Sequence, residues 1–290
     1  MQQKSFGKLP PVSALTLGGG GLGMVWGETT FEECVATVHA AVNAGINWID
    51  LAPRYGDGKA ELVVGEAFAG RLPEGVRVTS KCNVGNPSSA DIEPLVRQSI
   101  EGSLERLRLS RLDLFFLHSN VVPDADYRAR RPDAASRMTL YGTFVDQVRP
   151  LFERLVAEGL IGAWGLTGIG HPDTIIKLLG ERPAPSAVQC SIRAVQAGAL
   201  TTVMDRPLPD DHPETRDYVR AAGFRRLAGE LGATPALMAH RYALSLDVDT
   251  LVLGVKNRQE LAECVAAAEA GPLPPELLAR IDQTVDRKAC

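Results

Sequence analysis

The chain has 290 residues, of which 45% are hydrophobic and 23% are charged, as in ordinary globular proteins. Its 31 Lys and Arg residues are outnumbered by 35 Asp and Glu, and the resulting net charge of -4 argues against a nucleic-acid-binding protein, which normally carries a basic excess. No apolar run reaches the roughly 18 residues of a membrane helix, and the first residues lack the apolar segment of a secretory signal.

Short apolar runs alternate with amphipathic stretches along the chain. The first predicted helix lies between the capping pair Thr30 and Glu33 and the terminating Gly45. A long polar loop is expected over 119–142. The remaining expected elements are strands at 12–17, 46–51, 76–80, 112–117, 163–166, 187–192 and 250–255, and helices at 60–68, 91–109, 144–158, 172–179, 217–231, 235–244 and 258–270.

Strands made of continuous apolar runs indicate a parallel sheet covered by helices on the outside. Repeated strand–helix units over this length predict either a TIM-type (β/α)8 barrel or a doubly wound sheet, in one domain spanning residues 1–290. The seven expected strands are one fewer than a closed barrel needs. The shortage is near residues 189–194, where one helix and most of one strand have no room.

A glycine cluster between Gly18 and Gly23 contains G-x-G-x-x-G after a strand, which is the pattern of a dinucleotide-binding turn with Asp50 for a ribose. In that motif the helix begins within the glycines. Here Met24–Thr29 intervene before the expected helix. The alternatives are a tight turn and a close approach of backbone to a ligand.

Four ionisable groups follow three successive strands: Asp50 and Tyr55 after the second, Lys81 after the third, and His118 after the fourth. Carboxyl ends of barrel strands converge at one mouth, so these side chains are expected to meet there. An ammonium favours a neighbouring phenolate, a carboxylate holds the ammonium, and an imidazole orients a carbonyl oxygen. Such a set serves carbonyl reduction, with the hydride supplied from elsewhere.

Other chemistries find less support in the sequence. No HxH or HExxH spacing predicts a metal site, and no G-x-S-x-G predicts a serine hydrolase. The five cysteines lack CxxC spacing, which is typical of reduced thiols in a cytoplasmic protein.

The chain resembles the aldo-keto reductase family over nearly its full length. The residues that carry the resemblance are Asp50, Tyr55 and Glu61 in the segment DLAPRYGDGKAE, Lys81 after Ser80, and His118 between Leu117 and Ser119. The resemblance implies a (β/α)8 barrel that interconverts aldehydes or ketones with alcohols by using NADP(H), less often NAD(H). It assigns Tyr55 as the general acid, Lys81 and Asp50 as groups that tune its pKa, and His118 as the residue that orients the carbonyl.

The same resemblance implies where the coenzyme would bind. Thr167 and Gln189, at the ends of two strands, would hold the nicotinamide amide. Its phosphates would meet the last strand–helix junction, whose candidate residues are Gly254, Lys256, Arg258 and Glu263. Two departures stand out: Cys264 replaces the family's usual Asn, and the shortening near 189–194 falls beside the nicotinamide.

The expected partner is a small carbonyl or alcohol substrate, with no nucleic acid and no membrane. An alternative is a shortened, non-catalytic barrel that acts as a binding or scaffold protein.

Overall fold

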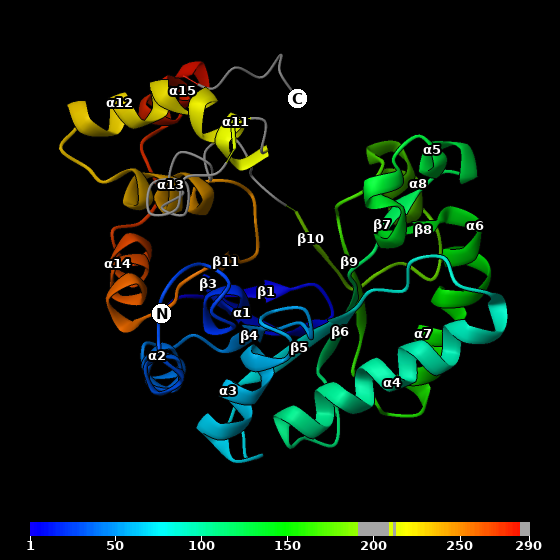
Figure 1. Cartoon of the computed structure of the whole chain (residues 1–290). Helices are drawn as coiled ribbons and strands as arrows, with labels where there is room; N and C mark the ends of the chain where they lie inside the picture. The colour runs from blue at the N-terminus through cyan, green and yellow to red at the C-terminus, as the bar shows by residue number, and fades with distance from the viewer. Residues whose placement is uncertain (191–208, 211–212, 285–290) are drawn as a thin grey trace.

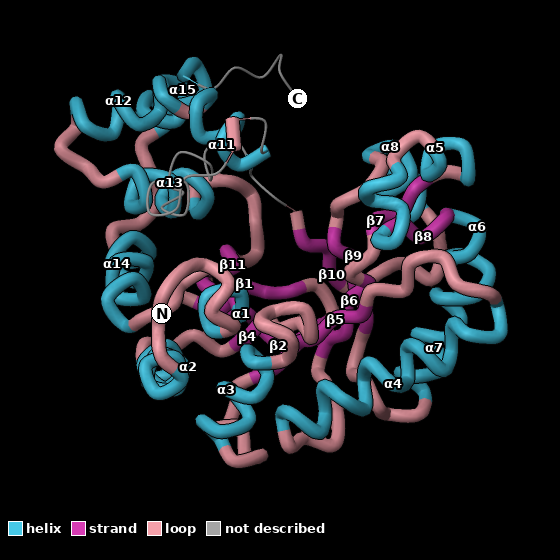
Figure 2. Tube along the Cα trace, in the orientation of Figure 1, coloured by secondary structure: helices cyan, strands magenta, loops and turns pink. Residues whose placement is uncertain are grey.

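The computed structural model describes residues 1–190, 209–210 and 213–284. Its main sheet has seven parallel strands in the order β10-β9-β6-β5-β4-β3-β11 (Figures 1 and 2). These strands are β3 (Leu15–Gly18), β4 (Trp48–Asp50), β5 (Arg77–Cys82), β6 (Leu114–Leu117), β9 (Trp164–Thr167), β10 (Ala187–Gln189) and β11 (Leu251–Leu253).

The strand order identifies the sheet as a partial (β/α)8 barrel. From β3 to β10 each strand of the main sheet lies beside the strand of this sheet that follows it in the chain, and the last strand, β11, pairs in parallel with β3. A doubly wound sheet would instead reverse its order at a switch point. Within the described residues β10 and β11 are the two edges. Most of the shortening predicted near 189–194 lies outside the described part, which resumes only at 209.

Helices cover the outer, convex face of the sheet (Figure 1). Those that follow the strands are α2 (Phe31–Asn43), α3 (Lys59–Phe68), α4 (Ser89–Leu107), α7 (Arg149–Ala157), α8 (Pro172–Gly180) and α14 (Arg258–Glu269). Their apolar sides and the buried strands form one core. Leu17, Ile49 and Phe115 are fully buried in it, as continuous apolar strands predict.

A second, smaller core lies outside the barrel wall, among helices close to the C-terminal end. Phe224, Met238 and Ile281 belong to it. The helices of this region are α11 (Pro213–Arg220), α12 (Ala222–Glu230), α13 (Pro235–Leu244) and α15 (Pro275–Thr284). The assignment of residues 1–290 to one domain stays a prediction.

The structure corrects several expected elements. The polar loop at 119–142 contains paired strands β7 (Asn120–Val122) and β8 (Met138–Leu140), together with α5 (Ala125–Ala129) and a 3₁₀ helix, η1 (Pro132–Arg137). These pieces are too short for periodicity to reveal. The single helix expected at 217–231 is interrupted at Ala221 between α11 and α12.

Further elements were not anticipated from the sequence. The chain opens with an antiparallel pair, β1 (Gln3–Phe6) and β2 (Leu9–Ser13), joined at Gly7 with φ +54°. The glycine cluster holds a short helix, α1 (Gly19–Leu22). The expected helix at 144–158 begins as α6 (Tyr141–Thr143) and a π-helical turn, η2 (Phe144–Val148), before α7.

Candidate active site at the strand ends

Lys81 lies at the centre of the predicted group, and its side chain is fully buried at the end of β5. Its ammonium donates hydrogen bonds to Asp50 Oδ2 at 2.7 Å, to the Leu51 carbonyl at 2.9 Å and to Tyr55 Oη at 3.2 Å. A buried ammonium is costly unless it is paired. These three acceptors satisfy its three donors, so the lysine is held against the tyrosine in a single orientation.

Asp50 is held equally firmly. Its Oδ1 accepts hydrogen bonds from Thr79 Oγ1 at 2.8 Å and from Gln189 Nε2 at 2.7 Å, while Oδ2 accepts the bond from Lys81. Thr79 lies opposite Asp50 in the parallel pairing of β4 and β5. Thr79 was missed by the sequence analysis, although it precedes Lys81 by two residues and therefore shares its face of the strand.

Tyr55 lies in the loop between β4 and α3. The loop comes so close to the glycine cluster that a Cβ on Gly56, which has φ +64°, would lie 2.0 Å from the Gly23 carbonyl oxygen. Burial raises the pKa of Tyr55, and Lys81 opposes that rise without cancelling it. The phenol is therefore protonated at neutral pH and available as a proton donor.

His118 follows β6 and faces the tyrosine. The two ring centroids are 5.9 Å apart in an edge-to-face arrangement. Burial lowers the pKa of His118 to about 4, and the Lys81 ammonium adds to this effect. The imidazole is consequently neutral at physiological pH, and its ring N–H can donate a hydrogen bond without carrying charge.

Glu61, part of the motif that carried the family resemblance, lies behind the site rather than in it. It is fully buried on α3 and accepts hydrogen bonds from Arg106 Nε on α4 and from Ser80 Oγ on β5, each at 2.6 Å. Ser80 is the neighbour of Lys81 in the strand. The carboxylate thus links the helix that follows the Tyr55 loop to the strand that carries the lysine.

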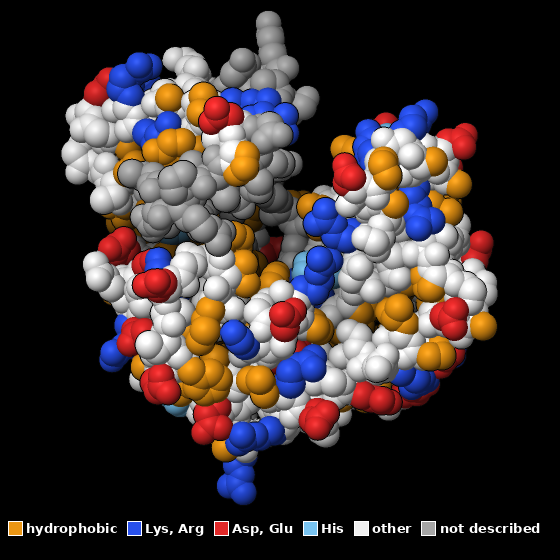
Figure 3. Space-filling model, viewed as in Figure 1, with side chains coloured by type: hydrophobic (Ala, Val, Ile, Leu, Met, Phe, Trp, Pro, Cys, Tyr) orange, Lys and Arg blue, Asp and Glu red, His pale blue; other side chains and the backbone are white. Residues whose placement is uncertain are grey.

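A cavity of about 430 Å³ lies inside the curled sheet. Its lining includes Trp48, Asp50 and Phe116 from the inner faces of the strands, and Gln189 and Gly254 near the two sheet edges. Tyr55, Lys81 and His118 are not among the lining residues, so the cavity meets the polar group at Asp50 and at the two residues that donate to it, Thr79 and Gln189. In the space-filling view the surface is hollowed between two groups of elements (Figure 3). One group is the helices α11, α12, α13 and α15, the other is the segment from β7 to α8, and Lys and Arg side chains lie along the hollow.

The glycine cluster serves close packing of backbone on backbone. A Cβ on Gly18 would lie 2.1 Å from the Leu253 carbonyl oxygen, and one on Gly21 would lie 1.9 Å from that of Val255. The glycines therefore allow α1 to contact the turn between β11 and α14. The dinucleotide-turn interpretation is not supported, because α1 has only four residues and the first long helix, α2, begins at Phe31.

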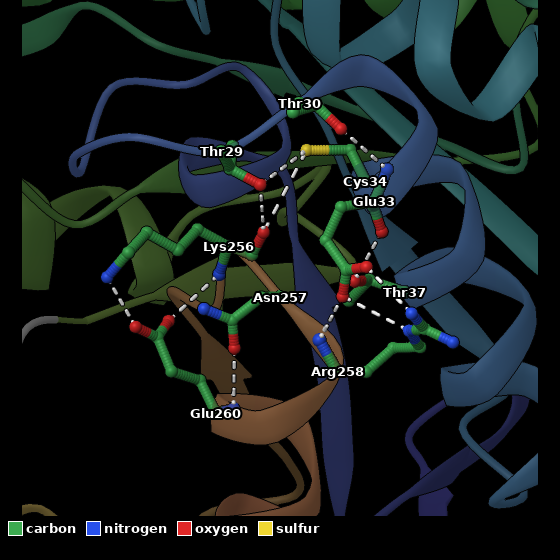
Figure 4. Close-up of polar contacts among 9 residues, drawn as sticks. All are labelled: Thr29, Thr30, Glu33, Cys34, Thr37, Lys256, Asn257, Arg258 and Glu260. Atoms are coloured by element: carbon green, nitrogen blue, oxygen red, sulfur yellow. Dashed lines mark hydrogen bonds and ion pairs between the residues drawn. The ribbon is translucent and has the colours of Figure 1, made fainter.

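The two candidate cations of the β11–α14 junction are engaged by carboxylates (Figure 4). Lys256 forms an ion pair with Glu260, and Arg258 Nη2 contacts Glu33 Oε2 at 2.9 Å. Thr29 ties the junction to the loop before α2, since its hydroxyl donates to the Lys256 carbonyl at 2.8 Å. The backbone N–H of Glu33 donates to the Thr30 hydroxyl, which is one half of a capping box. The Glu33 carboxylate does not make the other half, because it binds Arg258.

The other coenzyme candidates occupy different surroundings. Thr167 ends β9 and donates to the Leu117 carbonyl at 3.0 Å, and Gln189 ends β10 and contacts Asp50. Glu263 is exposed on α14 and forms no ion pair within the described residues. Cys264 is buried with its sulfur 3.6 Å from His240 Nδ1, and burial raises the pKa of its thiol to about 12, so the thiolate is unavailable.

The described residues contain neither a metal-binding cluster nor a membrane-spanning helix. In 1–190, 209–210 and 213–284, no group of three or more His, Cys, Asp or Glu side chains is placed to hold a metal ion. Across the same residues, no helix combines the length and apolar character needed to cross a membrane.

Comparison with known proteins gives consistent matches. The sequence model of the Aldo/keto reductase family matches residues 14–204 and 188–286. An L-galactose dehydrogenase from Arabidopsis thaliana is 28% identical over 229 residues, which are 78% of this chain and 62% of that protein. The chain therefore spans less than two thirds of the length of this relative.

Solved structures share the fold. A glycerol dehydrogenase from Gluconobacter oxydans superposes with a TM-score of 0.70 at 23% identity, covering 99% of this chain and 96% of that one. An aldo-keto reductase from Klebsiella pneumoniae, solved in complex with NADPH, superposes with a TM-score of 0.68 at 24% identity, covering 100% and 98%.

Proposed function

Because the chain belongs to the aldo/keto reductase family, we propose that it is an oxidoreductase that interconverts small aldehydes or ketones with alcohols. The proposed coenzyme is NADP(H) or NAD(H), whose nicotinamide ring carries the hydride. The observation that carries the proposal is the contact between Lys81 Nζ and Tyr55 Oη at 3.2 Å, made by an ammonium that Asp50 holds in place.

Tyr55 acts as the general acid in the proposed reduction. As the carbonyl carbon is reduced, its oxygen gains negative charge and takes the phenolic proton. Lys81 then stabilises the phenolate that remains, because an ammonium next to it favours the charged form. In alcohol oxidation the same phenolate accepts the proton.

Asp50 and His118 position the ammonium and the substrate carbonyl in the proposed reaction. Asp50 fixes the Lys81 ammonium, and Thr79 and Gln189 fix the carboxylate in turn. His118 remains neutral because burial lowers its pKa, so it orients the carbonyl oxygen by donating a hydrogen bond rather than a proton. The preorganised polar groups have little to rearrange when charge develops.

The coenzyme would extend from the ends of β9 and β10 to the β11–α14 junction. Thr167 and Gln189 would hold the nicotinamide amide. Gly254, Lys256, Arg258 and Glu263 would contact the phosphates and the adenosine. Gly254 is exposed, and among the described residues a Cβ there would have only Trp26 within 4 Å, at 3.7 Å, so its backbone is open to a ligand.

The assembled group favours an enzyme over the scaffold alternative, which would not need a buried lysine aimed at a tyrosine. The test is to incubate the purified chain with NADPH or NADH and a panel of small aldehydes and ketones, and to follow nicotinamide absorbance. We expect coenzyme oxidation that depends on the carbonyl compound. Coenzyme binding without turnover on any compound would favour the scaffold.

A further inference from the structure

The β11–α14 junction carries two basic side chains, but its anion-binding donors are already occupied by the protein's own carboxylates (Figure 4). Arg258 uses its backbone N–H, at 2.9 Å, and two guanidinium nitrogens, at 3.1 and 2.9 Å, on Glu33. These are the donors that a phosphate would use at a helix N-terminus.

The second cation is neutralised in the same way. Glu260 accepts from the Lys256 backbone N–H at 3.0 Å and also binds the Lys256 ammonium. The Glu260 N–H is itself used, since it donates to Asn257 Oδ1 at 2.8 Å. The two cations and two carboxylates together carry no net charge.

Glu33 remains ionised in this arrangement, because the hydrogen bonds from Arg258 lower its pKa. A phosphate monoester carries roughly -1.5 to -2 charges at neutral pH. To bind here it would have to displace a carboxylate or remain near one, and either costs free energy. A ribose hydroxyl has the opposite preference, since it can donate a hydrogen bond to a carboxylate, as acidic residues do for NAD in other folds.

We infer that Glu33 and Glu260 are specificity-determining residues that weaken selection for the 2′-phosphate of NADP(H), so that the chain also accepts NAD(H). This inference rests on the proposed function, which places the adenosine end of the coenzyme at this junction.

The experiment measures dissociation constants of NADH and NADPH by nicotinamide fluorescence, without substrate, for the wild type, Glu33→Gln, Glu260→Gln and the double variant. Glu269→Gln, at the far end of α14, is the matched control for the loss of one negative charge from that helix. Thermal melting of each variant checks that it is folded. Both ion pairs are partly exposed to solvent, and pairs near the surface contribute little to stability, so folding should persist.

We expect the wild type to prefer NADPH by no more than tenfold. Each glutamine substitution should tighten NADPH binding by about tenfold, the size of one charge-assisted hydrogen bond. The same variants should change NADH binding by less than about threefold, and the control should leave the ratio of the two constants unchanged.

A wild-type preference for NADPH above tenfold overturns the inference. So does a ratio that moves by less than about threefold in the double variant, with coenzyme still bound. These results would leave the proposed function intact, whereas failure of both dinucleotides to bind would overturn the inference together with the proposed coenzyme.

Discussion

Gln189 donates a 2.7 Å hydrogen bond to Asp50, although three strands separate β10 from β4 in the sheet. Strands lie about 4.8 Å apart, so a flat sheet would place these two strands roughly 19 Å from each other. The contact therefore crosses the interior of a strongly curled sheet. One end of the described barrel wall is thus joined directly to the carboxylate that holds Lys81.

Replacing Tyr55 with Phe removes the proposed proton donor and keeps the ring. We expect kcat to fall by at least about 100-fold, because general acid catalysis contributes 10²- to 10⁴-fold, with coenzyme affinity unchanged. Steady-state kinetics and fluorescence titration measure both. Tyr141→Phe, whose hydroxyl binds Glu181 elsewhere, is the control. Unreduced turnover in Tyr55→Phe would refute the assignment.

Replacing Asp50 with Asn leaves the fully buried Lys81 ammonium without a counter-ion. Removing one partner of a buried ion pair costs about 3–5 kcal/mol, so urea unfolding should show a loss of this size. The double variant Asp50→Asn/Lys81→Met should recover part of it, because the unpaired charge is gone. Equal stability of Asp50→Asn and the wild type would show that the pair is not buried in solution.

The lowered pKa of His118 predicts a specific pH dependence of stability. Its pKa is about 4 in the folded protein, against 6.5 for an ordinary imidazole. Between these values the unfolded chain binds the proton and the folded one does not, so stability rises with pH across this window and is unaffected above it. Denaturation series at pH 4.5 to 7.5 should show a smaller rise in His118→Asn than in the wild type.

The lowered pKa of His118 also predicts how the activity depends on pH. Because the imidazole stays neutral near pH 6.5, the profile of kcat/KM for carbonyl reduction should lack an inflection there. On the alkaline side it should fall only when Tyr55 ionises, and burial raises that pKa above its ordinary value near 10. A clear acid limb near pH 6.5 that disappears in His118→Asn would contradict the neutral role.

The close approach at Gly21 gives a test of packing. A Cβ at this position would lie 1.9 Å from the Val255 carbonyl oxygen, and overpacking costs typically about 1–3 kcal/mol. Gly21→Ala should therefore lower the unfolding free energy by about that amount. Gly229→Ala is the matched control in another helix, where no atom that the structure describes lies within 4 Å of the added carbon; it should be neutral or slightly stabilising. Equal stability of both variants would rule out the clash.

The sequence predicted the strands of the main sheet and the polar residues at their ends well, because each follows from a single local pattern. Buried parallel strands need continuous apolar runs, so the strands were found to within a few residues, and polar side chains at their ends marked Asp50, Lys81 and His118. The short pieces between 119 and 142 have no such period. Two of them, β7 and β8, form strands because they pair with each other, which local propensity does not reveal.

Contacts between distant segments explain what the sequence did not show in the site. Glu33 fits a capping pair by spacing, yet its carboxylate binds Arg258, 225 residues away. Arg258 looked like a free cation for a phosphate for the same reason, because its partner is brought to it by tertiary packing. Lys256 has a local partner, Glu260, four residues along the chain. The glycine cluster likewise contacts the β11–α14 turn, which is remote in sequence.

The pairing of β3 with β11 has a consequence for folding in the cell. The first strand of the barrel hydrogen-bonds to a strand near the end of the chain, and such long-range pairs form slowly. During synthesis this edge of β3 stays unpaired until residues 251–253 have been made. We expect newly made chains to need protection from self-association until that late segment has left the ribosome.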